Sequence, residues 1–431
     1  MLKIHLSAIG MLLALGVVCP AQVTFTEYPI TSGSSFITKG PDGNLWFTES
    51  DANLIGRITP AGVLTEFPAG NQPTGITAGP DGNLWFTEEG GSAIGKMTTA
   101  GVVLAEYPVS YFPYGIVAGP DGNLWFTEFY MDRIGRITPA GVVTEFAILT
   151  GTYPTGITVG QDGNLWFTEQ GFRPDIASGV GASIGRITTA GMITEFALTD
   201  GTVPAAITMG PNGNLWFAEN IGNSIGRITT SGVITEFHLP TTGAYPFEVT
   251  AGSDGNLWFT EFLVNQIGRI TPTGVVTEFA IPTGNSRPRG ITAGSDGNVW
   301  FVENAANKVG RVNVGPRYGV CLLYDPTKAV RNGATIPIKL ELCNGSGNDL
   351  SSPSITLHAT SVTQTSTSIS GAVEDSGNAN PDSDFRFDSS LGSGGGYIFN
   401  LKTTGLSTGT YSLNFTVTGD SAIYSAPFQV K

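Results

Sequence analysis

The stretch Asp42-Gly43-Asn44-Leu45-Trp46-Phe47-Thr48-Glu49 returns six more times along this chain of 431 residues, with small changes. Each copy carries one tryptophan, and the copies together hold all seven tryptophans of the protein: Trp46, Trp85, Trp125, Trp166, Trp216, Trp258 and Trp300. Successive tryptophans lie 39, 40, 41, 50, 42 and 42 residues apart. A nearly constant period of about 40 residues is the signature of a repeat architecture.

The second copy shows what one repeat contains. Short runs rich in β-branched and aromatic residues stand at 75–78, 84–88, 93–98 and 102–107, and turns rich in Gly, Pro, Asp and Asn separate them. No long stretch shows the apolar period of a helix. These units predict an all-β chain, and four short strands per repeat favour a seven-bladed β-propeller over a solenoid.

The two ends of the repeat array indicate that it closes into a ring. Six copies finish with a fourth strand such as Thr65-Glu66-Phe67, but the seventh stops after residues 309–313. A matching segment, Thr26-Glu27-Tyr28-Pro29, stands before the first copy. Pairing of this segment with the last repeat removes the exposed edges that an open array would leave. We therefore expect a propeller over residues 22–315, closed by its N-terminal strand.

The last part of the chain has a different character. After Arg317 the period disappears, Ser, Thr, Gly and Asn become frequent, and several alternating, strand-like runs follow. This pattern predicts a small β-sandwich of immunoglobulin-like type over residues 316–431. Cys321 and Cys343 are predicted to form a disulfide in an oxidising compartment, and two buried free thiols are the alternative.

Residues 1–21 have the features of a secretory signal peptide. Lys3 supplies a positive start, residues 6–18 form an apolar run too short to span a bilayer, and Ala21 suits a cleavage site. A lipoprotein signal at Cys19 is the alternative, which the preceding Val18 disfavours because it is not small. We expect a secreted or extracytoplasmic protein, in the periplasm or at the cell surface, without a membrane span.

Composition narrows the range of partners. The formal net charge is −14, so nucleic acid is a poor partner, and we expect a monomer. The sequence contains no nucleophile motif, zinc motif or phosphate loop. Its three histidines, His5, His238 and His358, all fall outside the first strands of the repeats.

Residues that recur in every repeat are interpreted first as scaffold. The tryptophans are predicted to pack between adjacent sheets, and the Asp-Gly-Asn segments to be turns, because a calcium loop needs more oxygen ligands. The glutamate that ends each second strand recurs with a basic residue on the third strand, and we interpret these as seven cross-strand ion pairs. A carboxylate ring that binds a cation is the alternative. The pairs are Glu49 with Arg57, Glu88 with Lys96, Glu128 with Arg136, Glu169 with Arg186, Glu219 with Arg227, Glu261 with Arg269 and Glu303 with Arg311.

Positions that differ between repeats are the candidates for a binding site. The first strand of each blade is expected to lie innermost and to face the channel. Its opening residues are Ser35, Thr74, Tyr114, Thr155, Ala205, Phe247 and Arg289. We predict a ligand site with Tyr114, Phe247, Glu248, Arg287 and Arg289, and a salt bridge between Glu248 and the arginines is the alternative. An insertion at residues 170–183 of the fourth repeat is expected to overhang one mouth of the ring.

The repeat units "GPDGNLWFTE", "IGRIT" and "GVVTEF" resemble those of the virginiamycin B lyase (streptogramin lyase) family over about residues 24–313. The resemblance implies a seven-bladed propeller. It also implies an enzyme that opens a cyclic depsipeptide antibiotic by elimination, with Mg²⁺, histidine as general base or acid, and nearby glutamate.

The catalytic residues of that family are not matched. Its histidines follow Pro at the start of the first strand in the last two blades, where this sequence has Phe247 and Arg289. A family glutamate two places before the last histidine aligns with Arg287. Neither Phe nor Arg can shuttle a proton near neutral pH. We therefore expect the scaffold without the catalytic set.

These observations lead to one main functional hypothesis and two alternatives. The main one is a secreted, lyase-like propeller that binds a small molecule, peptide or glycan at the channel mouth, with the C-terminal sandwich as a spacer or attachment module. The first alternative is an active C–O lyase that uses Mg²⁺ and carboxylates, with Glu248 as the candidate catalytic residue. The second is a structural or adhesive cell-surface protein.

Overall fold

The computed structural model describes residues 23–149, 152–171, 181–199, 202–314, 319–326, 328–343, 349–365, 369–371, 383–392, 395–417 and 420–431. The signal peptide predicted at residues 1–21 lies outside the described residues. The described part is all-β, as expected, with one 3-10 turn at Ser50–Ala52 (η1). None of the described helical segments is long and apolar enough to cross a membrane.

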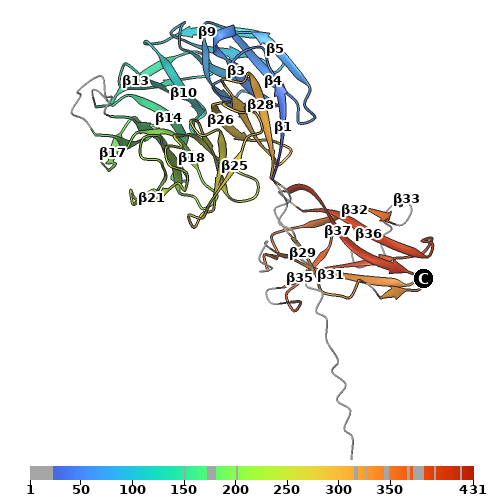
Figure 1. The fold of residues 1–431 in the computed structure, drawn as a ribbon. Coiled ribbons are helices and arrows are strands. Elements are labelled where there is room, and N and C mark those ends of the chain that lie inside the picture. The colour runs from blue at the N-terminus through green and yellow to red at the C-terminus, as the bar shows by residue number, and fades with distance from the viewer. Residues whose placement is uncertain are drawn as a thin grey trace, which may run out of the picture. The chain divides into compact units, whose positions relative to one another are not determined.

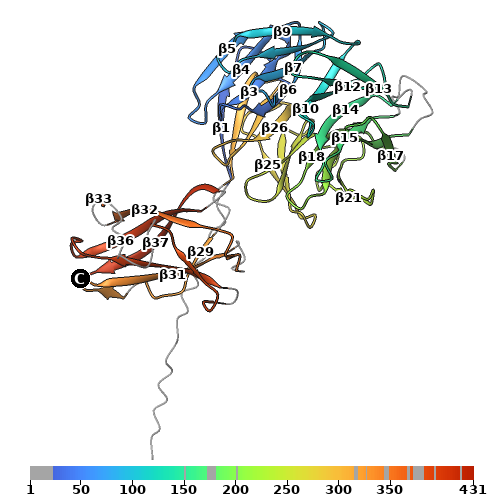
Figure 2. The ribbon, with the colours of Figure 1, turned by 180° about the vertical axis from the view of Figure 1, so that it is seen from behind.

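Seven four-stranded antiparallel sheets form the blades of the propeller (Figures 1 and 2). Blade 1 contains β2 (Ile37–Lys39), β3 (Leu45–Glu49), β4 (Leu54–Ile58) and β5 (Leu64–Pro68). Blade 2 contains β6 (Pro73–Ala78), β7 (Leu84–Glu88), β8 (Ala93–Met97) and β9 (Val103–Pro108). Blade 3 contains β10 (Pro113–Ala118), β11 (Leu124–Glu128), β12 (Arg133–Ile137) and β13 (Val143–Ala147). Blade 4 contains β14 (Pro154–Val159), β15 (Leu165–Glu169), β16 (Ser183–Ile187) and β17 (Ile193–Ala197).

The remaining blades repeat the same order. Blade 5 contains β18 (Pro204–Met209), β19 (Leu215–Glu219), β20 (Ser224–Ile228) and β21 (Ile234–His238). Blade 6 contains β22 (Pro246–Ala251), β23 (Leu257–Glu261), β24 (Gln266–Ile270) and β25 (Val276–Ala280). Blade 7 contains β26 (Pro288–Ala293), β27 (Val299–Glu303), β28 (Lys308–Asn313) and, as its fourth strand, β1 (Thr24–Pro29).

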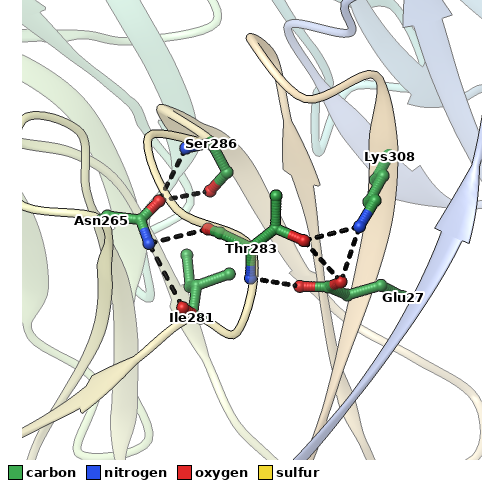
Figure 3. Close-up of polar contacts among 6 residues, drawn as sticks. All are labelled: Glu27, Asn265, Ile281, Thr283, Ser286 and Lys308. Carbon is green, nitrogen blue, oxygen red and sulfur yellow. Dashed lines mark hydrogen bonds and ion pairs between the residues drawn. The ribbon is translucent and has the colours of Figure 1, made fainter.

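The N-terminal strand closes the ring, as the sequence predicts. β1 pairs antiparallel with β28, and Glu27 stands opposite Gly310. Figure 3 shows the side chain of Glu27 accepting hydrogen bonds from the backbone N–H and hydroxyl of Thr283, at 3.1 and 2.7 Å, and from Nζ of Lys308 at 2.8 Å. The first strand of the chain is thus bonded to the loop that enters blade 7 and to the blade's third strand.

The core of the ring lies between the blades. All seven tryptophans are completely buried, and each packs against residues of the next blade. Trp46 of blade 1, for example, belongs to one cluster with Leu84 and Phe86 of blade 2. Trp300 of blade 7 belongs to one cluster with Leu45 of blade 1, so the last interface is built like the others. Burial of an indole ring in each of seven interfaces supplies a large hydrophobic stabilisation.

Each tryptophan is fixed by polar contacts at its edge and by rings on its face. Nε1 of Trp46 donates to Oδ1 of Asp42 at 3.0 Å, so the Asp-Gly-Asn segment is a turn that orients the indole, as predicted. The ring of Phe67 on the fourth strand stacks on Trp46 with ring centroids 5.6 Å apart. Phe67 in turn leaves no room for a side chain at Gly101 of the next blade, where φ is +84°. Only glycine meets both the conformational and the steric requirement at that turn.

The predicted pairing of glutamate with arginine is wrong. Arg57 stands opposite Trp46 in the ladder, and Glu49 stands opposite Leu54. Because successive side chains alternate between the faces of a sheet, Glu49 and Trp46, three positions apart, point to opposite faces. The guanidinium of Arg57 lies 5.6 Å from the centre of the Trp46 ring and donates to the carbonyl of Thr99 in blade 2 at 3.2 Å. The basic residues therefore support the tryptophans and join neighbouring blades.

The seven glutamates are buried next to a second carboxyl group instead. Burial, and then the charge of Glu145 on the fourth strand, together raise the pKa of Glu128 to about 8. The same two causes act on Glu88, whose pKa rises to about 7 with Glu106 as the neighbour. The pKa is about 7 for Glu49, Glu169 and Glu303, and about 8 for Glu219 and Glu261, with burial as the first cause in each. At neutral pH these carboxyls keep much of their protonated population.

The C-terminal region contains two sheets. The first has the order β29 (Gly319–Leu322), β31 (Thr335–Cys343), β35 (Gly396–Lys402) and β34 (Arg386–Asp388). The second has the order β30 (Ala329–Val330), β37 (Asp420–Val430), β36 (Gly409–Val417), β32 (Leu357–Gln364) and β33 (Ile369–Gly371). Phe385 lies 5.0 Å from Phe399 of the first sheet and 5.0 Å from Phe415 of the second, measured between ring centroids. Cys321 and Cys343 are joined by a disulfide.

We predict that Tyr28→Ala destabilises the propeller about as much as Phe67→Ala. Tyr28 of β1 stacks on Trp300 with centroids 5.6 Å apart, just as Phe67 stacks on Trp46. Loss of either half-buried ring should lower the free energy of unfolding by roughly 2–4 kcal/mol. Chemical denaturation followed by tryptophan fluorescence measures both. A normal stability for Tyr28→Ala beside a reduced one for Phe67→Ala would show that β1 is not part of the ring in solution.

We predict that stability falls as the pH rises from about 5 to about 8.5. The buried glutamates have a higher pKa in the folded chain than the ordinary value of 4.5, so the folded state binds more protons in this range. Their contribution is complete below about pH 4.5 and is lost as the pH rises through 7 to 8. Denaturation midpoints across the pH range measure the effect. Glu128→Gln should flatten the profile and exposed Asp51→Asn should not; a profile that is flat or rises in the wild type would contradict the assignment.

Candidate ligand-binding site at the channel mouth

The first strands of the seven blades enclose a cavity of about 150 Å³. These strands are β2, β6, β10, β14, β18, β22 and β26, and each contributes to the lining. The apolar part of the lining includes Ile37, Ile76 and Ile116. The strands lie innermost, as the sequence predicts.

A bulge in the first strand aims the opening residues at the channel. In blades 2 to 7 the pairing of the first and second strands shifts register; in blade 3 this happens between Pro113 and Ile116. Thr127 holds that bulge, since its Oγ1 accepts from the N–H of Gly115 at 2.9 Å and donates to the carbonyl of Thr155 in blade 4 at 2.8 Å. Such bulges re-aim side chains and end the ladder. The group formed by Phe36, Tyr114, Phe247 and Glu248, which line the cavity, and by Arg289 beside Phe247 is called the channel mouth below.

Blades 6 and 7 bring both predicted arginines beside aromatic rings. The guanidinium carbon of Arg289 lies 5.1 Å from the centre of the Phe247 ring and 5.6 Å from that of Phe262. The guanidinium carbon of Arg287 lies 5.7 Å from the same Phe262 ring. Arg289 also donates from Nη1 to the hydroxyl of Ser35 in blade 1 at 3.3 Å. Phe247 and the two arginines therefore belong to one cluster, with Phe262 at its centre.

Glu248 lines the cavity from blade 6 and forms no ion pair with any other residue that the structure describes. Thr260 Oγ1 accepts from the backbone N–H of Glu248 at 3.1 Å and donates to the carbonyl of Arg289 at 2.7 Å. Thr260 thus links the backbones of Glu248 and Arg289. Among the described residues, however, Glu248 forms no ion pair with Arg287 or Arg289. Burial raises the pKa of Glu248 to about 8. The salt bridge considered as an alternative is therefore not formed.

Tyr114 stands on the opposite side of the channel mouth. Its ring lies 5.4 Å from that of Phe36 in blade 1, edge to face, and 6.1 Å from that of Phe129. Burial raises the pKa of the Tyr114 hydroxyl to about 12; Arg289 opposes this shift, whereas Glu248 and Glu89 add to it. Tyr114 thus lies within the electric field of the charged residues of blades 2, 6 and 7.

Several residues of the site were not singled out from the sequence. Phe36 occupies the position where most blades have glycine, so the alignment of repeats that revealed Glu248 could also have revealed it. Phe262 lies in the turn after the second strand of blade 6, where no repeat signal marks it. Gln170 lines the cavity from the insertion of blade 4. Residues 172–180 of that insertion, which were expected to overhang the mouth, lie outside the described residues.

The residues of the mouth do not fit a magnesium ion. Mg²⁺ requires near-octahedral oxygen ligands, with carboxylates among them. In the part of the chain that the structure describes, no three His, Cys, Asp or Glu side chains are grouped so that they could hold a metal ion. At the channel mouth the lining contains one carboxyl group, that of Glu248, and the neighbouring charges include Arg289. We derive no chemical step through a metal.

The chain is similar to a known family and to several solved structures. The model of the virginiamycin B lyase family matches residues 14–173 and 177–330. The crystal structure of selenomethionine-substituted virginiamycin B lyase from Staphylococcus aureus is 40% identical, with a TM-score of 0.62, and the match covers 68% of this chain and 99% of that one. No curated protein sequence matches this chain.

Two further structures extend the comparison. A catalytically inactive histidine-to-alanine variant of the Staphylococcus aureus enzyme, solved with quinupristin, is also 40% identical, with a TM-score of 0.62 and coverage of 68% of this chain and 99% of that one. The Cps50 (Swd1) β-propeller domain of Myceliophteria thermophila is 11% identical, with a TM-score of 0.56 and coverage of 68% and 100%, which shows the shared fold alone.

Proposed function

Because this chain belongs to the virginiamycin B lyase family, we propose that its propeller binds a small organic ligand at the channel mouth without the histidine chemistry of its relatives. The observation that carries the proposal is the pair Phe247 and Arg289 at the family's histidine positions, packed against each other 5.1 Å apart. An arginine keeps its proton at any physiological pH, and a phenyl ring has none to exchange. Both side chains can contact a ligand, but neither can transfer a proton at physiological pH.

The lining of the cavity supports binding. Ligand sites are mostly apolar and enclosed, with a few convergent polar groups. Here isoleucines and aromatic rings supply the apolar surface, and Glu248, Gln170 and Thr155 supply polar atoms. We also propose that the chain is exported by its N-terminal leader and that the C-terminal sandwich serves as a spacer or attachment module.

A second candidate function is a C–O lyase in which Glu248 acts as the base. The specific observation in its favour is the raised pKa of Glu248, about 8, which lies close to the working pH of a general base. In this hypothesis Glu248 removes a proton from the carbon adjacent to the one that bears the leaving oxygen. The electrons of that C–H bond form a C=C bond as the C–O bond breaks, and Arg289 would stabilise the carboxylate that leaves.

We predict that the protein does not open the ring of a streptogramin B antibiotic. The test incubates protein, antibiotic and Mg²⁺, with the Staphylococcus aureus lyase as positive control, and follows the reaction by chromatography and mass spectrometry. Elimination gives a product of shifted retention and unchanged mass, whereas hydrolysis adds one water. Ring opening that disappears in Glu248→Gln would overturn the prediction and establish the second candidate.

We predict that small molecules bind at the channel mouth and that binding depends on Phe247. A ligand-observed NMR screen with a library of small amides, acids and sugars should give hits for the full chain. These hits should be lost in Phe247→Ala, which removes the ring beside the cavity, and kept in Met192→Ala, which truncates an apolar side chain that is 72% exposed. Hits that persist in Phe247→Ala would place binding elsewhere, and a screen without hits would speak for the structural alternative.

A further inference from the structure

We propose that the channel mouth is an anion site and that its ligand is a ring-bearing carboxylate, with the carboxylate on Arg289 and the ring in the cavity. This inference rests on the proposed function, because it names the ligand class of the same site. It follows from four features of the mouth: an arginine with unused donors, a local excess of positive charge, a cavity of suitable size, and a loop that is already fixed.

Arg289 has hydrogen-bond donors left over. The contact that its guanidinium makes in the described structure is the bond of Nη1 to Ser35, and its Nε is buried without a hydrogen-bond partner. Phe247 and Phe262 pack against the guanidinium. A guanidinium held between rings still presents N–H groups at its edge, and a carboxylate can accept two of them in parallel.

The channel mouth carries an excess of positive charge, although the whole protein is acidic, with a formal net charge of −14. Arg287 and Arg289 are both within 6 Å of the Phe262 ring, and neither has an ion-pair partner in the described part of the chain. Two acids stand nearby. Burial raises the pKa of Glu248 to about 8, so much of it is protonated at neutral pH. Burial also raises the pKa of Glu89, against the opposing effects of Thr74 and Arg289.

The cavity beside Arg289, lined by its neighbour Gly290 and by Phe247, has the volume of one ring. Its volume of about 150 Å³ matches that of an engineered apolar cavity that binds benzene. Isoleucines line the cavity together with Phe36, Tyr114 and Phe247. We expect a six-membered or indole ring to fill the space and its carboxylate, a bond or two away, to reach Arg289, which packs against Phe247. A protonated Glu248 can donate a hydrogen bond to the same carboxylate.

The loop that carries Arg287 is fixed before any ligand arrives. Figure 3 shows the side chain of Asn265, from blade 6, bonded to several residues of this loop. Its Oδ1 accepts from the N–H and the hydroxyl of Ser286, both at 2.7 Å. Nδ2 of Asn265 donates to the carbonyls of Ile281 and Thr283 at 3.2 and 2.8 Å. Arg287 follows in the left-handed conformation, with φ of 50°. A site that is ordered in advance loses less entropy on binding.

The same ligand chemistry has two sources. One is a free aromatic acid, such as benzoate or indole-3-acetate. The other is the C-terminal aromatic residue of a peptide. The experiment therefore uses isothermal titration calorimetry of the full chain with benzoate, indole-3-acetate and a tripeptide that ends in phenylalanine, each beside its uncharged amide.

We expect at least one of the acids to bind, and its amide to bind at least about tenfold more weakly, because a charge-assisted bidentate contact is lost. Arg289→Gln should weaken the acid by a similar factor and leave the amide unchanged. Arg331→Gln, which removes an exposed arginine of the C-terminal region, should change neither. If the free acids bind more tightly than the tripeptide, the ligand is a free aromatic acid. If the tripeptide binds more tightly, the ligand is the C-terminal residue of a peptide.

The outcomes separate this inference from the function on which it rests. An amide that binds as well as its acid overturns the carboxylate site and leaves binding at the mouth intact. Failure of every acid to bind overturns the carboxylate site as well. The NMR screen tests separately whether the channel mouth binds any small molecule. Should Arg289→Gln fail to fold, the comparison of acid and amide on the wild type decides. Binding of the acid should weaken above about pH 8 as Glu248 ionises; the charged and titratable groups around it are Glu89, Arg287, Arg289 and Tyr114.

Discussion

The contact between the tryptophan of one blade and the strands of the next holds this protein together. A single sheet of four short strands has two apolar faces and cannot bury them alone, so each blade depends on both neighbours. The indole fills the interface, the Asp or Asn of the preceding turn fixes its edge, and a basic residue covers its face while bonding to the next blade. The interface between blades 7 and 1 follows the same plan, which is why the N-terminal strand has to return.

Because the other strands form the interfaces between blades, the residues that open the first strands can vary from blade to blade. The second, third and fourth strands carry the repeated residues of the interfaces. The start of each first strand faces the channel, is bulged in blades 2 to 7, and holds residues that vary around the ring, with threonine repeated at Thr74 and Thr155. The ring is therefore symmetric where it is packed and asymmetric where it can meet a ligand.

Under the proposed function, the channel mouth recognises charge instead of transferring protons. A histidine-to-alanine variant of the Staphylococcus aureus enzyme is catalytically inactive. Here Phe247 and Arg289, which stand where the family resemblance expects histidine, pack against each other. Arg289 beside the buried Glu248 would then make a pocket that holds an anion rather than one that breaks a bond.

Sequence alone determined the repeat, the number of blades, the closing strand and the innermost position of the first strands, because a period of seven tryptophans has one compact solution. It also identified Phe247, Glu248 and Arg289 as departures from the repeat. Tertiary structure decided which side chains meet. The glutamates were paired with arginines from their nearness in sequence, but the register sends Glu49 and Arg57 to opposite faces. Phe262 became the centre of the arginine cluster because blade 6 and blade 7 converge at the channel, and no pattern within one repeat records a contact between two.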